Sequence, residues 1–210
     1  MEQIAYILLG WCLGLASHLL LAADYRRKQK KELVSAIATE LKELQFTLAS
    51  AVYRVAVRHG NDDRKLLEWL KPIQEQHSKI HPSEELVDNL NYLLKGTDAE
   101  LAASSQAMRQ KESSRALAVK KFEVPFLDTQ LGQLSMLEPR TQQALLHIRW
   151  KLSLINQEVD DGREWFRMTY RDPDKSIEHN LEATYDQLAY QARAAVDLIT
   201  TTLLMLEVAS

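Results

Sequence analysis

The stretch DYRRKQKKELVSAIATELKELQFTLASAVYRVAVRH, residues 24–59, contains neither glycine nor proline. Because no residue in it breaks a helix, it predicts a single helix about 54 Å long. Its apolar residues recur at alternating spacings of four and three, the a/d pattern of a coiled coil or a long bundle. The predicted buried seam consists of Ile37, Leu41, Leu44, Leu48, Ala51 and Val55.

Immediately before this helix, residues 4–23 read IAYILLGWCLGLASHLLLAA, with no acidic or basic residue other than His18. Twenty helical residues span roughly 30 Å, the hydrocarbon thickness of a bilayer, so the segment predicts a transmembrane anchor. The basic residues that follow directly are Arg26, Arg27, Lys28, Lys30 and Lys31. Because such clusters remain on the cytoplasmic side, we expect a single-pass protein of the inner (plasma) membrane with most of the chain in the cytoplasm.

Two alternatives remain for this segment. A cleaved signal peptide fits less well than an anchor, because the basic cluster follows the apolar run instead of preceding it. Gly10 and Gly14 form a small-xxx-small pair, which predicts self-association of two spanning helices. The alternative for this pair is incidental packing, since glycine is common in spanning helices.

The rest of the chain predicts further helices separated by short breaks. Helix ends, kinks or new starts are expected at Gly60, Pro72, Pro82, Thr97, Pro125 and Pro139. In the C-terminal third, a second seam is formed by Leu145, Ile148, Leu152, Ile155 and Val159.

The last helix is expected to begin with Asp172 as N-cap and Pro173 at the first helical position. Its predicted buried face consists of Ile177, Leu181, Tyr185, Leu188, Ala192, Ala195, Ile199, Thr202 and Leu206. Two long helices joined by so short a connection must lie antiparallel.

The expected fold is therefore all-α: an N-terminal transmembrane helix that continues into an elongated up-and-down helical bundle with coiled-coil-like packing. We expect a membrane anchor over residues 1–23, a basic juxtamembrane stalk over 24–58, and a cytoplasmic bundle over 59–210 that packs on the stalk. The composition agrees, since 6 glycines and 5 prolines are few for 210 residues and leave little room for turns. The single cysteine, Cys12, excludes a disulfide framework within one chain.

Charge is distributed unevenly along the chain. Residues 24–58 hold eight basic and four acidic side chains, whereas residues 59–210 hold eighteen basic and twenty-four acidic ones. Basic residues beside a membrane are attracted by anionic lipid, which accounts for the basic stalk. The alternative, a nucleic-acid-binding arm, is disfavoured because the acidic bundle would repel a phosphate backbone. We therefore expect a lipid partner and no nucleic-acid partner.

No short motif of an enzyme is present: the chain has no phosphate-binding loop, no G-x-S-x-G, no H-E-x-x-H and no dinucleotide fingerprint. His77 and His81 are four residues apart, as two metal ligands on one helix face would be, but Pro82 disfavours helical geometry at His81. We therefore expect no catalytic residue, no metal site and no cofactor.

Aromatic and arginine residues gather near the predicted tip of the C-terminal hairpin. Arg163, Trp165, Arg167 and Tyr170 are a candidate partner surface, because these residue types are enriched in interfaces. In the alternative interpretation, Trp165 and Phe166 close the core, and the arginines form solvated ion pairs with Asp160, Asp161 and Glu164.

These features lead to a hypothesis of a non-enzymatic interaction module: a membrane-tethered scaffold, adaptor or sensor subunit that meets a protein partner or forms a homo-oligomer through the stalk seam. The second hypothesis is a membrane-linked effector or regulator, for example in stress or phage defence, triggered by a ligand or partner bound between helices. An enzyme is the third, because helical bundles also host active sites without short motifs.

Overall fold

A computed structural model describes residues 2–79, 84–112, 119–171 and 174–209 of the chain. In this part, every regular element is helical, so the predicted all-α class is confirmed. The elements are α1 (Glu2–His59), α2 (Arg64–Ser78), α3 (Glu84–Lys95), α4 (Asp98–Glu112), α5 (Pro125–Thr129), the 3-10 helix η1 (Leu131–Met136), α6 (Pro139–Arg171) and α7 (Lys175–Ala209).

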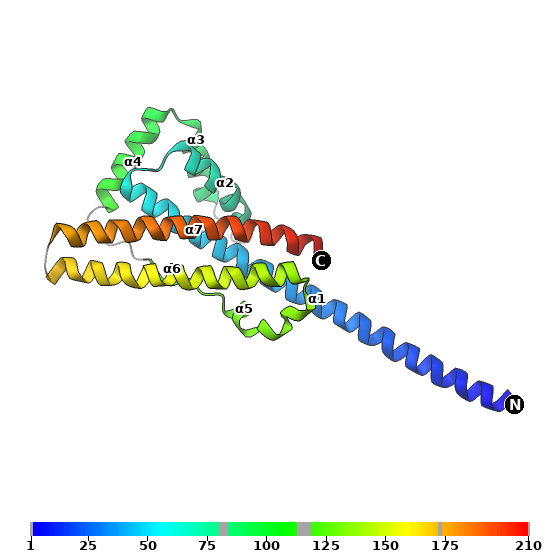
Figure 1. Cartoon of the computed structure of the whole chain (residues 1–210). Helices are drawn as coiled ribbons and strands as arrows, with labels where there is room; N and C mark the ends of the chain where they lie inside the picture. The colour runs from blue at the N-terminus through cyan, green and yellow to red at the C-terminus, as the bar shows by residue number, and fades with distance from the viewer. Residues whose placement is uncertain (1, 80–83, 113–118, 172–173, 210) are drawn as a thin grey trace.

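The three long helices form the centre of the molecule. Helices α6 and α7 lie antiparallel as a hairpin, and α1 crosses α7 at an angle (Figure 1). The most extensive helix contacts are those of α7 with α6 and with α1. The short helices α2, α3 and α4 form a separate group beside the C-terminal end of α1, so the simple up-and-down order expected from the sequence holds only for the long helices (Figure 1).

The seam predicted on the first helix is buried. Ile37, Leu41 and Leu48 are 0% exposed, and Leu44, Ala51 and Val55 are also in the core. Helices α7, α2, α4 and α5 of the same chain contact α1. A fully buried leucine contributes about 1.5–3 kcal/mol, so this seam is a main source of stability. Because the chain covers its own seam, self-association through these residues would require the helices to separate.

The end of α1 has the geometry that the sequence predicts for a C-terminal glycine. Gly60 has a φ of 75°, in the left-handed region. Its N–H donates to the Val57 carbonyl at 3.2 Å, and the Asn61 N–H donates to the Ala56 carbonyl at 2.8 Å. These two bonds form a Schellman motif. The Asp63 side chain then accepts a hydrogen bond from the Leu66 N–H at 2.9 Å and caps α2.

A polar pair lies within the contact between α1 and α7. Gln45 is 3% exposed, and its side-chain amide donates to the Thr200 hydroxyl at 2.7 Å. The Thr200 hydroxyl in turn donates to the Val196 carbonyl at 2.9 Å. A satisfied polar pair in an apolar seam favours one register over others, because sliding the helices would leave the Gln45 amide buried without a partner.

The segment between α4 and α6 is held by long-range hydrogen bonds that no sequence pattern indicates. The Glu40 carboxylate of α1 accepts from the Phe126 N–H at 2.7 Å and the Leu127 N–H at 2.9 Å, at the start of α5. The Asn156 side chain of α6 pairs with both the N–H and the carbonyl of Phe122, each at 2.8 Å. These contacts position Phe122 and Leu127 in the core.

The predicted pattern of the C-terminal hairpin is largely confirmed. All five seam residues of α6 are buried, and so is the predicted face of α7 apart from Ile177, which is partly exposed. The start of α7 differs from the prediction: its first residue is Lys175, and the Asp174 side chain accepts from the Ser176 N–H at 3.1 Å. Asp174 therefore caps this helix, whereas Asp172 and Pro173 lie outside the described residues.

The other predicted breaks vary in outcome. Thr97 and Glu100 form a capping box before α4, and Pro125 and Pro139 are the first residues of α5 and α6. Pro72, where a kink is expected, lies inside α2, which continues to Ser78. Pro82 lies outside the described residues.

Two glycine-to-alanine substitutions should change stability in opposite directions. Gly60→Ala places a side chain at positive φ and should lower the free energy of unfolding by about 1–2 kcal/mol. Gly162 lies inside α6, where an added Cβ would meet Tyr185 and Thr184 at ordinary contact distances of 3.5 and 3.7 Å. Gly162→Ala should therefore raise the free energy of unfolding by up to about 1 kcal/mol.

Thermal unfolding of the full-length chain in mild detergent, followed by circular dichroism, measures both effects. Each variant is the other's control, because the chemical change is the same. A loss of stability in Gly162→Ala, or none in Gly60→Ala, would contradict the helix boundaries described above.

Candidate functional site

The first half of α1 projects away from the bundle as a single helix (Figure 1). Its first buried side chain in the described part is Leu33. Before this residue, the exposed fractions are 69% for Trp11, 71% for both Leu20 and Leu21, and 63% for Tyr25. Exposed large apolar side chains are typical of surfaces that interact with another molecule or a membrane.

Among the residues whose side chains the structure describes, no helix is both long enough and apolar enough to cross a membrane. Most side chains of the predicted anchor, residues 4–23, lie outside this described part. The backbone of α1 is helical from Glu2 and passes Gly10 and Gly14 without a break. Self-association through these two glycines remains a prediction.

The predicted membrane-surface residues form a basic collar between the apolar segment and the bundle. The collar consists of Arg26, Arg27, Lys28, Lys30 and Lys31. Lys30 is partly exposed and the other four are exposed. None of the five takes part in an ion pair of the described residues, so the chain leaves these side chains available to an outside partner. The helix rises about 15 Å from Ala23 to Leu33, and the collar lies within this length along the helix axis.

An ionic cluster joins the C-terminal end of α1 to α7. The Arg58 guanidinium donates to Glu182 Oε1 from Nε at 3.0 Å and from Nη2 at 2.8 Å. The two ring nitrogens of His59 face Glu182 and Asp186, the latter at 2.7 Å from Nδ1. The Arg58 guanidinium also lies 5.3 Å from the centre of the Tyr185 ring.

The cluster is suited to a structural role. Burial would raise the pKa of Glu182, but hydrogen bonds and charge from Arg58 and His59 outweigh burial and hold that pKa below its ordinary value. Cationic side chains at the end of α1 also interact favourably with the helix dipole. Both ring nitrogens of His59 face carboxylates, so this side chain bridges two acidic residues of α7. The cluster thus fastens α1 to α7.

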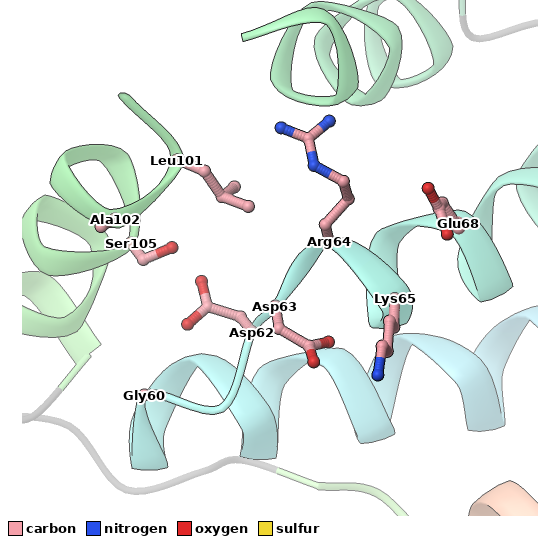
Figure 2. A pocket seen from close by; sticks show the side chains of 9 residues that line it. All are labelled: Gly60, Asp62, Asp63, Arg64, Lys65, Glu68, Leu101, Ala102 and Ser105. Carbon is pink, nitrogen blue, oxygen red and sulfur yellow. The ribbon is translucent and has the colours of Figure 1, made fainter. Parts of the chain in front are cut away.

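A pocket of about 550 Å³ lies between the start of α2 and α4 (Figure 2). Residues of the α1–α2 connection and the first turns of α2 line one side, and Leu101, Ala102 and Ser105 of α4 line the other. The Arg64 side chain is held by two backbone carbonyls. Its guanidinium donates to that of Leu94 at 2.6 Å and to that of Gly96 at 2.7 Å. No periodic pattern or motif in the sequence indicates this pocket, because it forms between segments separated by α3.

The four residues of the candidate partner surface lie in the last three turns of α6, where Arg163, Arg167 and Tyr170 are exposed and Trp165 is partly buried. Trp165 and Phe166 pack against the core, as the alternative interpretation proposed. Arg163 lies 3.6 Å from Asp160 and donates to the Val119 carbonyl at 3.1 Å.

The remaining members of that surface are more exposed. Arg167 lies 3.6 Å from Glu164, which is an ordinary exposed ion pair. Tyr170 is 77% exposed and contacts the Phe166 ring edge-on, with 5.1 Å between ring centres. Tyr170 is therefore the more exposed of the two aromatic residues in this set.

His77 has a packing role. Its ring stacks on Phe46 with 3.7 Å between ring centres, and its Nε2 lies 3.3 Å from Glu43. His81, its predicted neighbour in a possible metal pair, lies outside the described residues. Within the described part of the chain, no group of three or more metal-ligating side chains occurs.

Comparison of the chain with protein-family models, with curated proteins and with solved structures finds no match. What the fold itself defines is a class: an all-α protein of long packed helices with one helix extending beyond the bundle. Its function is inferred from the geometry of this chain alone.

Removing the charge of Glu182 should destabilise the fold in a pH-dependent way. The lowered pKa means that the carboxylate stabilises the fold above its unfolded-state pKa near 4.5 and loses this effect as the pH falls through the lower folded-state value. Glu182→Gln should therefore lower the free energy of unfolding by about 1 kcal/mol at pH 7, a value reduced by the partial exposure of the group.

The difference between wild type and Glu182→Gln should shrink as the pH falls below 4.5. Thermal unfolding at several pH values measures this difference. Glu32→Gln, which removes an exposed carboxylate from α1, is the matched control and should match wild type at each pH. A Glu182→Gln effect that is constant with pH would show that the ionic cluster does not contribute through charge.

Proposed function

We propose that this protein is a single-pass, membrane-anchored helical bundle that acts as a non-enzymatic scaffold, adaptor or sensor subunit through protein–protein interaction. The observation that supports this most is the projecting half of α1, whose described apolar side chains are exposed and lead into the basic collar. In this proposal, residues 4–23 cross the inner (plasma) membrane and residues 59–210 form the cytoplasmic bundle.

The energetics of the projecting helix favour lipid over water. A helix satisfies its own backbone hydrogen bonds, so it can enter hydrocarbon without leaving polar groups unpaired. Each collar residue near an anionic surface gains about 1 kcal/mol, and the same charges resist transfer across the membrane. The proposed orientation therefore follows from the position of the collar on the C-terminal side of residues 4–23.

The path of α1 suits a sensor or adaptor. One helix of 58 residues runs from the proposed anchor, through the core, to the ionic cluster at Arg58 and His59. Helix α7 contacts both α1 and α6, so a change in the position of α1 would displace the whole hairpin of α6 and α7. Such coupling needs no catalytic group.

Partner binding is assigned to exposed apolar side chains of the bundle and to the predicted surface of Arg163, Trp165, Arg167 and Tyr170. On α6, Leu146 and Trp150 lie one turn apart and are 49% and 55% exposed. Trp and Tyr are enriched at interface hot spots. Formation of a homo-oligomer is assigned to Gly10 and Gly14 in the membrane, since the chain covers the stalk seam itself.

A second candidate function is a membrane-linked effector or regulator, for example in stress or phage defence, triggered by a ligand or partner bound between helices. The pocket between α2 and α4 favours this candidate, because its volume of about 550 Å³ is in the usual range for small-molecule sites. Growth arrest on overexpression that requires residues 4–23 would support the effector. Normal growth would support the interaction module.

Charging the apolar segment tests the anchor. In the double variant Leu13→Arg and Leu15→Arg, each arginine near the middle of the segment should disfavour membrane insertion by about 3 kcal/mol. We expect the wild-type chain in the membrane fraction, released by detergent and not by high salt, and the double variant in the soluble or degraded fraction.

Leu204→Arg is the matched control, because Leu204 is 60% exposed on α7 and tolerates a charge there. This variant should stay in the membrane fraction. Wild-type protein in the soluble fraction without detergent, or a C-terminal tag accessible from outside the cell, would contradict the proposal.

A further inference from the structure

The pocket between α2 and α4 contains polar groups of two kinds, those with a partner and those without one. The charged and hydroxyl side chains of its lining are those of Asp62, Asp63, Arg64, Lys65, Glu68 and Ser105. Arg64 is bound to two backbone carbonyls, and the Asp63 carboxylate accepts from the Leu66 N–H at 2.9 Å. These two side chains therefore hold the shape of the pocket.

Asp62 and Ser105 have no such partner. Asp62 is 7% exposed and Ser105 is 5% exposed, yet no hydrogen bond or ion pair of the described residues involves either side chain. Figure 2 shows the Asp62 carboxylate and the Ser105 hydroxyl pointing toward one another across the space between α2 and α4. A buried carboxylate without a partner is costly, so this arrangement favours a bound group that supplies hydrogen bonds and positive charge.

The surroundings of Asp62 agree with an uncompensated negative charge. Burial and the Asp62 carboxylate both raise the pKa of the Tyr53 phenol. Asp63 and Glu68 add two further carboxylates at the pocket, while Arg64 and Lys65 add two cations, so the lining carries a net charge of −1. The Arg64 guanidinium is bound to carbonyls, so it does not pair with Asp62, and the net negative charge favours a cation over an anion.

The shape of the site limits the size and character of the cation. Leu101 and Ala102 provide an apolar wall beside the Ser105 hydroxyl. A volume of about 550 Å³ accommodates a small molecule with a short apolar body. Ammonium and guanidinium groups are the donors that match a carboxylate and a hydroxyl acceptor in one place.

We propose that this pocket binds a small organic cation whose ammonium or guanidinium group pairs with Asp62 and donates to Ser105 while its apolar part lies on Leu101 and Ala102. The bound cation would join the α1–α2 connection to α4 and so fix the group of short helices against α1. This inference deepens the second candidate function by naming the class of its trigger, and it rests on that candidate for its biological role only.

The test uses the full-length chain in mild detergent and four probes of similar size: butylammonium, butylguanidinium, neutral butanol and anionic butyrate. Ligand-observed NMR at constant ionic strength measures binding. We expect saturable binding of the two cations and none of butanol or butyrate.

Three variants locate the site. Asp62→Asn should weaken binding of both cations at least tenfold, and it should fold, because it removes a buried charge. Ala102→Trp enters the pocket from an exposed position and should also prevent binding without altering the core. Asp24→Asn makes the same change as Asp62→Asn on the exposed projecting helix and should bind like wild type.

Equal binding by wild type and Asp62→Asn, with both shown to be folded by circular dichroism, would overturn the proposal. Absence of saturable binding of both cations to wild type at 100-fold molar excess or at any higher soluble concentration would overturn it as well. Because binding is measured in detergent, it does not depend on membrane insertion or on growth arrest. Failure of the anchor or of the effector function is therefore distinguishable from failure of this site.

Discussion

The packing of α1 against α7 is the contact on which the rest of the structure depends. Ile37, Leu41 and Leu48 of α1 are fully buried, and the Gln45–Thr200 pair between α1 and α7 favours one register. Helix α7 also pairs with α6, so the same contact places the C-terminal hairpin relative to α1. The Glu40 carboxylate then fastens α5 to α1, and the ionic cluster at Arg58 and His59 closes the far end. Without the seam, none of these polar contacts would have fixed partners.

Helix α1 consists of two segments whose apolar side chains are in different surroundings. Beyond Leu33 its apolar face is covered by the chain itself, whereas before Leu33 the described apolar side chains have no cover from the bundle. Between the two lie the five cations of the collar and about 15 Å of helix. Because α1 is continuous, a membrane or molecule that binds its first half is joined directly to the core of the bundle. This is why we favour a role in anchoring and signal transfer over one in chemistry, and why the pocket between α2 and α4 matters as a second input.

Sequence periodicity predicted the parts of the fold that depend on local repeats: the seam of α1, the seams of α6 and α7, and the helix ends at Gly60, Thr97 and Pro139. Periodicity did not predict the hydrogen bonds that depend on how the helices cross. The Glu40 carboxylate bonds Phe126 across 86 residues of sequence, and Asn156 bonds Phe122 across 34. The sequence around Glu40 and around Asn156 does not distinguish these residues from ordinary exposed polar residues. The residues of the basic collar were identified from their position directly after the apolar segment. The pocket was not predicted, because Asp62 and Ser105 come together only after α3 and α4 fold back.

The central claim is that the first segment of α1 lies in lipid and the collar lies in water. A nitroxide on Cys12, the only cysteine of the chain, reports on this directly in full-length protein reconstituted into vesicles. We expect this label to collide with oxygen and to be shielded from a water-soluble nickel chelate, and a label at Tyr25→Cys in a Cys12→Ala background to show the reverse. Equal exposure of both labels to the nickel chelate would contradict the account.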